Sequence, residues 1–150
     1  MTQLDEFEIP TGNGLQPPDG EGRCVLLVED DPALRRYLEV VLQRAGYKVL
    51  SADDGLEGMK FLLKAPVDVV VTDALMPNLD GYELCRFVRS SQSLSHLPII
   101  LLSALDPRNS TDESEQVDVF LSKPVSPEDL LASIESMNHA NHKDTKTQIK

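Results

Sequence analysis

The sequence lacks the long apolar run that a membrane-spanning helix requires. Crossing a bilayer takes about 18 or more consecutive apolar residues, and no such stretch occurs in this chain of 150 residues. The first 20 residues carry acids, prolines and glycines, and not the basic start and short apolar stretch of a secretory signal. We therefore expect no membrane insertion and a cytoplasmic location.

Basic residues are also scarce. Lys and Arg total 14 against 25 Asp and Glu, which gives a formal net charge of −11. Nucleic acid is a polyanion that proteins hold largely through Lys and Arg contacts to its phosphates. An acidic chain repels such a partner, so we expect no direct contact with nucleic acid.

Cysteine occurs twice, at Cys24 and Cys85, each within an apolar segment. Two separated thiols form neither the disulfide framework of a small secreted domain nor a zinc site. We expect both to be buried thiols in a reducing compartment.

Apolar residues, in contrast, make up 41% of the chain, enough for the core of one ordinary domain. Residues 1–23 contain many turn formers and acids and too little apolar content to pack, which predicts a disordered leader. Residues 139–150 are polar without periodicity, as in a fraying tail or a linker. The folded domain is expected over residues 24–138.

Within this domain, short apolar runs alternate with segments of helical periodicity. The expected strands are 24–28, 48–52, 67–72, 99–102 and 119–121. Several are almost continuously apolar, as in strands that helices cover on both faces. The pattern predicts a doubly wound α/β fold in three layers, α/β/α, with a five-stranded parallel sheet. Right-handed crossovers leave few strand orders, and among these we expect the flavodoxin-like order 2-1-3-4-5.

Helices are expected after each strand. In the first helix, Pro32 stands in the first turn, Gly46 follows the end, and one face should be buried. That face consists of Leu34, Tyr37, Leu38, Val41 and Leu42. Further helices are expected near 55–64 and 82–90, and a last one should begin at Ser126 and Pro127. Segment 106–116 has no apolar residue except Pro107, so the fourth helix should be short or irregular.

Polar side chains follow four of the expected strands. In strand order they are Glu29, Asp30 and Asp31, then Asp73, Ser103 and Lys123. The carboxyl ends of parallel strands share one edge of the sheet, where ligands bind. Carboxylates that meet there need a proton or a cation, and hard oxygen ligands suit Mg²⁺. Lys123 can balance the remaining negative charge.

Each of these residues also has a simpler interpretation. Acids after a strand often cap the next helix, as Asp31 before Pro32 is expected to do. A lone Asp73 or Ser103 is more often structural, and a lone lysine is usually a solvated surface charge. Their joint placement at four strand ends is what favours a functional site.

Four blocks of sequence resemble, in order, the signature of response-regulator receiver domains of two-component signalling. They are 28–32 (VEDDP), 72–81 (TDALMPNLDG), 102–104 (LSA) and 120–124 (FLSKP). Any one block alone would be a weak signal, but the four together are specific. The resemblance covers roughly residues 23–138 and is to the chemotaxis-type single-domain receivers.

The resemblance implies a phospho-accepting site. Asp73 matches the aspartate that takes the phosphoryl group, and Glu29 and Asp30 match the acidic pair that holds Mg²⁺ together with Asp73. The backbone carbonyl of Leu75 matches the remaining protein ligand. The cofactor implied is Mg²⁺.

The resemblance also implies a switch and its partners. Ser103 matches the switch hydroxyl, Phe120 the switch aromatic, and Lys123 the lysine of the site, with a cis peptide before Pro124. The implied phosphoryl donor is a sensor histidine kinase or a phosphotransfer protein. The signal would pass to a downstream protein target or to an output domain missing from this chain, and a homodimer is left open.

Two other functions compete with this interpretation. A receiver-like adaptor would bind a partner without phosphorylation, although the complete acceptor set argues against it. A Mg²⁺ phosphatase of the haloacid dehalogenase type also uses a strand-end aspartate, but it requires a second acid two residues later, where this chain has Leu75. We therefore expect a signalling receiver that catalyses only its own phosphorylation and dephosphorylation, and no other enzyme activity.

Overall fold

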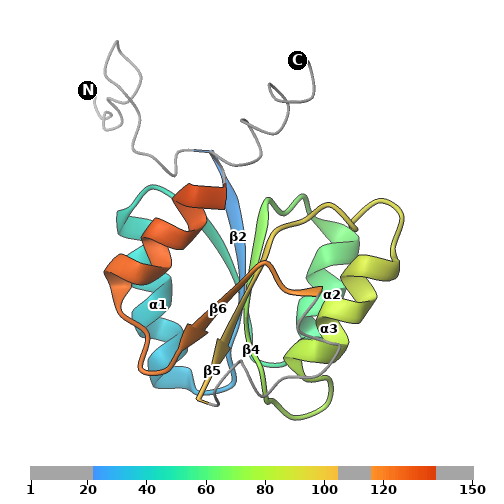
Figure 1. Ribbon diagram of the computed structural model, residues 1–150, viewed down its shortest axis with the longest axis horizontal. Helices are drawn as coiled ribbons and strands as arrows, with labels where there is room; N and C mark the ends of the chain where they lie inside the picture. Colours follow the sequence, from blue (N-terminus) through green and yellow to red (C-terminus); the bar gives the residue numbers. More distant parts are fainter. Residues whose placement is uncertain (1–21, 105–115, 138–150) are drawn as a thin grey trace, which may run out of the picture.

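Five parallel strands form a single sheet with helices on both faces in the computed structural model, which describes residues 22–104 and 116–137 (Figure 1). The strands are β2 (Cys24–Val28), β3 (Lys48–Ala52), β4 (Val69–Asp73), β5 (Ile99–Ser103) and β6 (Val119–Ser122). The helices are α1 (Pro32–Arg44), α2 (Gly55–Lys64), α3 (Gly81–Ser90) and a last helical stretch, 127–137. The sheet order β3-β2-β4-β5-β6 confirms the predicted order 2-1-3-4-5.

The two faces of the sheet pack against different helices. Val25, Leu27 and Val71 point toward α1 and the last helix, whereas Leu26, Val28 and Val70 point toward α2 and α3, because successive side chains of a strand alternate between faces. The central strands β4 and β5 are buried along their whole length. This double coverage explains their continuously apolar sequences.

Several element boundaries differ from the predictions by one or two residues. The strand predicted at 67–72 begins at Val69, because Asp68 is engaged in a reciprocal pair of hydrogen bonds with Cys24. Helix α3 begins at Gly81, not at residue 82, because Asp80 and Glu83 form a capping box. Strands β5 and β6 each extend one residue further than predicted, to Ser103 and Ser122.

Helix α1 has the predicted caps but not the whole predicted buried face. Asp31 accepts hydrogen bonds from the backbone N–H groups of the first turn, and Gly46 follows the end with φ 99°. Leu38 and Leu42 are buried, but Tyr37 is 48% exposed, so the prediction for Tyr37 was wrong. Tyr37 precedes Leu38 and is therefore rotated by about 100° around the helix, away from the sheet.

The remaining predictions have mixed outcomes. Cys85 is buried as expected, but Cys24 is only half-buried because it opens strand β2 at the edge of the core. Ser126 caps the last helix through a hydrogen bond from the backbone N–H of Asp129 to its Oγ, 2.9 Å long. The expected leader up to residue 21, the polar tail and the irregular segment 106–115 lie outside the described residues.

A single arginine ties helix α3 to the starts of β5 and β6. The guanidinium of Arg89 donates to the carbonyl oxygens of Ser95, Leu97 and Gln116 at 2.7–3.0 Å. It also pairs with the carboxylate of Asp118 at 2.8 Å, which in turn accepts the backbone N–H of Ile99. One side chain thus supplies donors to three carbonyls in two separate segments, the one before β5 and the one before β6.

We expect Arg89→Ala to lower the free energy of unfolding by about 2 kcal/mol, because several partly buried acceptors lose their donor together. Arg36→Ala is the matched control, since Arg36 pairs only at the surface with Glu39 and should cost less than about 1 kcal/mol. Urea unfolding followed by circular dichroism measures both. Equal unfolding midpoints would contradict the stabilising role of Arg89.

Candidate functional site

Three carboxylates meet at the carboxyl edge of the sheet, as the strand ends predicted. Glu29 and Asp30 follow β2, Asp73 ends β4, and one oxygen from each lies within 4.8 Å of the others. Asp30 is exposed, whereas Glu29 is fully buried and Asp73 is 6% exposed. The group is therefore open to solvent on the Asp30 side and enclosed on the other.

Backbone hydrogen bonds hold both strand ends in place. The N–H of Glu29 donates to Ala52 of β3, 3.1 Å away, and the N–H of Ala74 donates to Leu102 of β5, 2.8 Å away. The hydroxyl of Thr72 donates to the carbonyl oxygen of Asp73. These bonds continue the pairing of the sheet up to the residues that carry the carboxylates.

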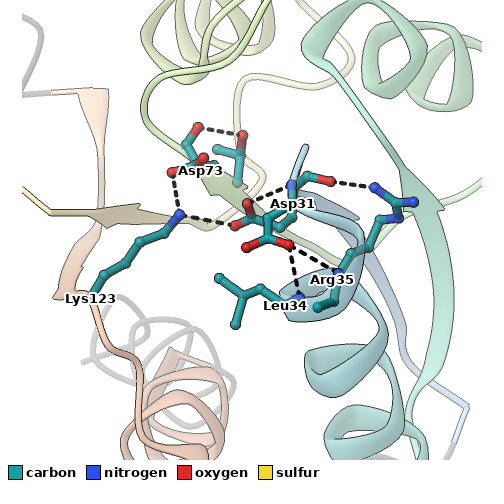
Figure 2. A network of polar contacts seen from close by, with 8 residues as sticks. Asp31, Leu34, Arg35, Asp73 and Lys123 are labelled. Atoms are coloured by element: carbon teal, nitrogen blue, oxygen red, sulfur yellow. Dashed lines mark hydrogen bonds and ion pairs between the residues drawn. The ribbon is translucent and has the colours of Figure 1, made fainter.

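Lys123 reaches into this acidic group from the loop after β6 (Figure 2). Its Nζ lies 2.9 Å from Oδ1 of Asp73 and 3.2 Å from Oε1 of Glu29. Its backbone N–H donates to Ser103 at the end of β5, and the peptide bond to Pro124 is cis. The ammonium is thus held at the group by both neighbouring strands.

Glu29 has one oxygen satisfied and one not. Oε2 accepts the backbone N–H of Asp31 at 3.1 Å. Oε1 is buried without a hydrogen-bond partner, because Lys123 is near enough for an ion pair but not aligned for a hydrogen bond. The ammonium of Lys123 is thus the charge partner of this buried oxygen, which has room for a further electrostatic partner such as a bound cation.

The buried carboxylates favour a bound proton or cation. Burial raises the pKa of Glu29, and the nearby charge of Asp73 raises it further, against hydrogen bonding from Asp31 and attraction to Lys123. Burial likewise raises the pKa of Asp73, against its contact with Lys123. Burial lowers the pKa of Lys123, but the two carboxylates outweigh it and raise that pKa overall. Three hard oxygen donors at this spacing fit a divalent cation such as Mg²⁺.

The other predicted site residues lie at the same edge or beside it. Ser103 is buried at the end of β5, in register with Ser122. Phe120 is half-buried on β6 and packs with the α2 and α3 side of the core. Leu75, two residues beyond Asp73, is 59% exposed. Asp31 caps α1, which confirms the simpler interpretation for that residue.

Two residues that support the site, Arg35 and Asn78, were not predicted from the sequence. Arg35 of α1 donates from Nη1 to the carbonyl oxygen of Glu29, 2.8 Å away. Asn78, with φ 72°, donates to the carboxylate of Asp54, the N-cap of α2, and so attaches the loop after β4 to that helix. Nothing in the local sequence distinguishes these side chains from solvated polar residues.

The chain is thus a parallel α/β protein with a group of three carboxylates and one lysine at the carboxyl ends of its strands. The family model described as the response regulator receiver domain matches residues 25–135. The chain therefore belongs to the response-regulator receiver family, whose members are signalling modules of two-component systems.

Curated relatives of different lengths match this chain. The transcriptional regulatory protein GltR of Pseudomonas aeruginosa is 39% identical over 77% of this chain and 49% of its own length. Protein PilG of the same organism is 30% identical over 77% of this chain and 87% of its own length. The sensor histidine kinase TmoS of Ectopseudomonas mendocina is 32% identical over 89% of this chain and 14% of its own. The chain spans about half the length of several curated relatives that it matches.

Solved structures agree with the fold. TrrA of Thermotoga maritima, a response regulator in complex with Mg²⁺-BeF, is 28% identical with a TM-score of 0.70, over 76% of this chain and 97% of that one. The chemotaxis response regulator CheY4 of Vibrio cholerae is 31% identical with a TM-score of 0.68, over the same shares. Among the described helices, none has the length and apolarity needed to span a membrane.

Proposed function

We propose that Asp73 accepts a phosphoryl group in the presence of Mg²⁺ and that this modification switches a protein-interaction surface. The observation that carries the proposal is the position of the Asp73 carboxylate, 2.9 Å from Lys123 and grouped with Glu29 and Asp30. A nucleophile, a cation to balance the transferred charge, and a set of metal ligands are thus held in one place.

Each residue has a distinct part in the proposed transfer. An oxygen of Asp73 attacks phosphorus in line, a P–O bond forms, and the P–N bond of a donor phosphohistidine breaks. Lys123 holds its ammonium beside the acceptor and neutralises charge on the transferring oxygens. Glu29 and Asp30, with Asp73 and the carbonyl of Leu75, would hold Mg²⁺, which when bound supplies further positive charge to the phosphoryl oxygens.

Phosphorylation then changes the conformation of two side chains, one on β5 and one on β6. Ser103 donates a hydrogen bond to the phosphoryl group, and Phe120 turns inward into the space that Ser103 vacates. Both residues stand on strands that end at the same edge of the sheet as Asp73, so a local charge alters the surface around β6.

The proposed partners follow the family and stay predictions. They are a sensor histidine kinase or phosphotransfer protein as donor, and a downstream protein or an output domain outside residues 24–138 as target, with action in the cytoplasm. The matches to transcriptional regulators do not support the expectation that nucleic acid has no part in the output. The acidity of the chain bears only on this domain.

Incubation with acetyl phosphate and MgCl₂, followed by mass spectrometry, tests the proposal. We expect the mass of one added phosphoryl group on a peptide that contains Asp73, and no addition when EDTA is present. An unmodified protein that still captures its partner would support the alternative, a phosphorylation-independent adaptor.

Metal binding should depend on both members of the acidic pair. Glu29→Gln and Asp30→Asn should each weaken Mg²⁺ binding by about tenfold or more, because each removes a charged ligand. Asp53→Asn removes the same charge from an exposed turn and should leave the affinity nearly unchanged. Isothermal titration with MgCl₂ measures all three, and wild-type affinity in both site variants would contradict the assignment.

A further inference from the structure

The turn that carries Glu29 and Asp30 is held by a side chain that touches neither carboxylate. Arg35 lies one turn into α1, and its backbone N–H donates to the carbonyl of Asp31 at 2.8 Å. Its guanidinium folds back and donates from Nη1 to the backbone carbonyl of Glu29 at 2.8 Å (Figure 2). Residue 35 therefore bonds both ends of the turn from 29 to 31: the Asp31 end through the first backbone hydrogen bond of the helix, and the Glu29 end through the arginine side chain.

The carbonyl of Glu29 lies just beyond the last paired residue of strand β2. The last register pairs of β2 are Val28 with Ala52 and Val28 with Thr72. The N–H of Glu29 still reaches Ala52, but its carbonyl oxygen accepts from Arg35, which supplies the donor that a strand would otherwise provide. Arg35 thus extends the ordered backbone to the residue that carries the buried carboxylate.

We infer that Arg35 is a positioning residue for the metal site: it fixes the turn so that Glu29 and Asp30 converge with Asp73. The inference rests on the proposed function, because it assumes that these carboxylates hold Mg²⁺. Partners that orient metal ligands without touching the metal commonly have large effects on affinity.

Positioning and simple electrostatics predict effects of opposite sign. Arg35 carries a positive charge close to an acidic group, so its removal alone would make the site more negative and strengthen the binding of a cation. If Arg35 fixes the turn, its removal lets the carboxylates of Glu29 and Asp30 move. Mg²⁺ binding then becomes weaker, because the turn must become ordered when the ion binds. The direction of the change therefore separates the two roles.

The neighbouring arginine provides a matched control. The side chain of Arg36 is 72% exposed and pairs with Glu39 on the surface of α1. Arg35→Met and Arg36→Met remove the same charge one residue apart, but only the first removes a donor to the turn. We expect Mg²⁺ binding roughly tenfold weaker in Arg35→Met and unchanged or slightly tighter in Arg36→Met.

Isothermal titration with MgCl₂ alone measures affinity, and amide exchange of residues 29–31 without metal measures order. Faster exchange of this turn in Arg35→Met, together with weaker binding, supports the inference. Wild-type or tighter binding in Arg35→Met overturns it while leaving the proposed function intact. A wild-type protein that binds no Mg²⁺ overturns both.

A second variant covers failure to fold. Arg35→Lys keeps the charge but replaces the planar fork by an ammonium, which does not reproduce the same geometry. If circular dichroism shows Arg35→Met to be unfolded, weaker Mg²⁺ binding by a folded Arg35→Lys supports positioning. Wild-type affinity in that variant overturns it.

Discussion

Asp73→Asn should abolish phosphorylation by acetyl phosphate, because an amide oxygen is too poor a nucleophile to attack phosphorus. The substitution keeps the shape of a side chain that is nearly buried at the end of β4. The loss should therefore come from the chemistry and not from the fold, and it should be complete within the detection limit of intact-protein mass spectrometry.

Asp53→Asn is the matched control for this loss. Asp53 is exposed in the turn before α2, outside the group formed by Glu29, Asp30 and Asp73. This variant should be phosphorylated at the wild-type rate. A stable phosphoryl group on the Asp73→Asn protein would show that another residue is the acceptor.

Gly81→Ala should strongly destabilise the protein, because the added methyl meets backbone atoms of the acceptor strand. A Cβ at Gly81 would lie 2.2 Å from the carbonyl oxygen of Asp73 and 3.1 Å from Cα of Ala74, so α3 or the end of β4 must move. We expect the free energy of unfolding to fall by about 3 kcal/mol. Phosphorylation should slow as well, because the displaced backbone belongs to the acceptor.

Gly58→Ala provides the comparison. A Cβ there would meet Cγ2 of Val28 at 2.9 Å, a side-chain methyl and not backbone, and alanine gains about 1 kcal/mol of helix propensity over glycine. Its net effect should stay within about 1 kcal/mol, measured by urea unfolding. Equal unfolding midpoints for the two variants would refute the steric role assigned to Gly81.

The strand predictions succeeded where apolar runs are bounded by polar residues. Strands 24–28 and 48–52 have the predicted bounds. Arg23 and Glu29 flank the first apolar run, and Gly46 and Asp53 lie just before and after the second. The prediction at 67–72 was less accurate because Val67 is apolar but stands before the bonds between Asp68 and Cys24. Apolar content alone cannot predict a hydrogen bond between residues that lie 44 positions apart in the sequence.

The site was predictable because it follows from topology. In a parallel sheet of this order the residues after β2 and β4 must be neighbours, so the meeting of Glu29, Asp30 and Asp73 required only the strand ends. Lys123 joined them because β6 ends at the same edge. Their proposed roles came from the family resemblance.

The sequence by itself determined the parallel α/β class, the caps of α1 and the residues of the acidic edge, because these depend on local periodicity and on a small set of allowed connections. The structure decided which of the allowed strand orders the chain adopts. Only the tertiary structure decided that Tyr37 faces solvent, that Arg89 joins three segments and that Arg35 bonds the carbonyl of Glu29. The physical reason is the reach of a long or amphipathic side chain. Its partner depends on which backbone groups packing leaves without donors, and this is known only when the elements are assembled.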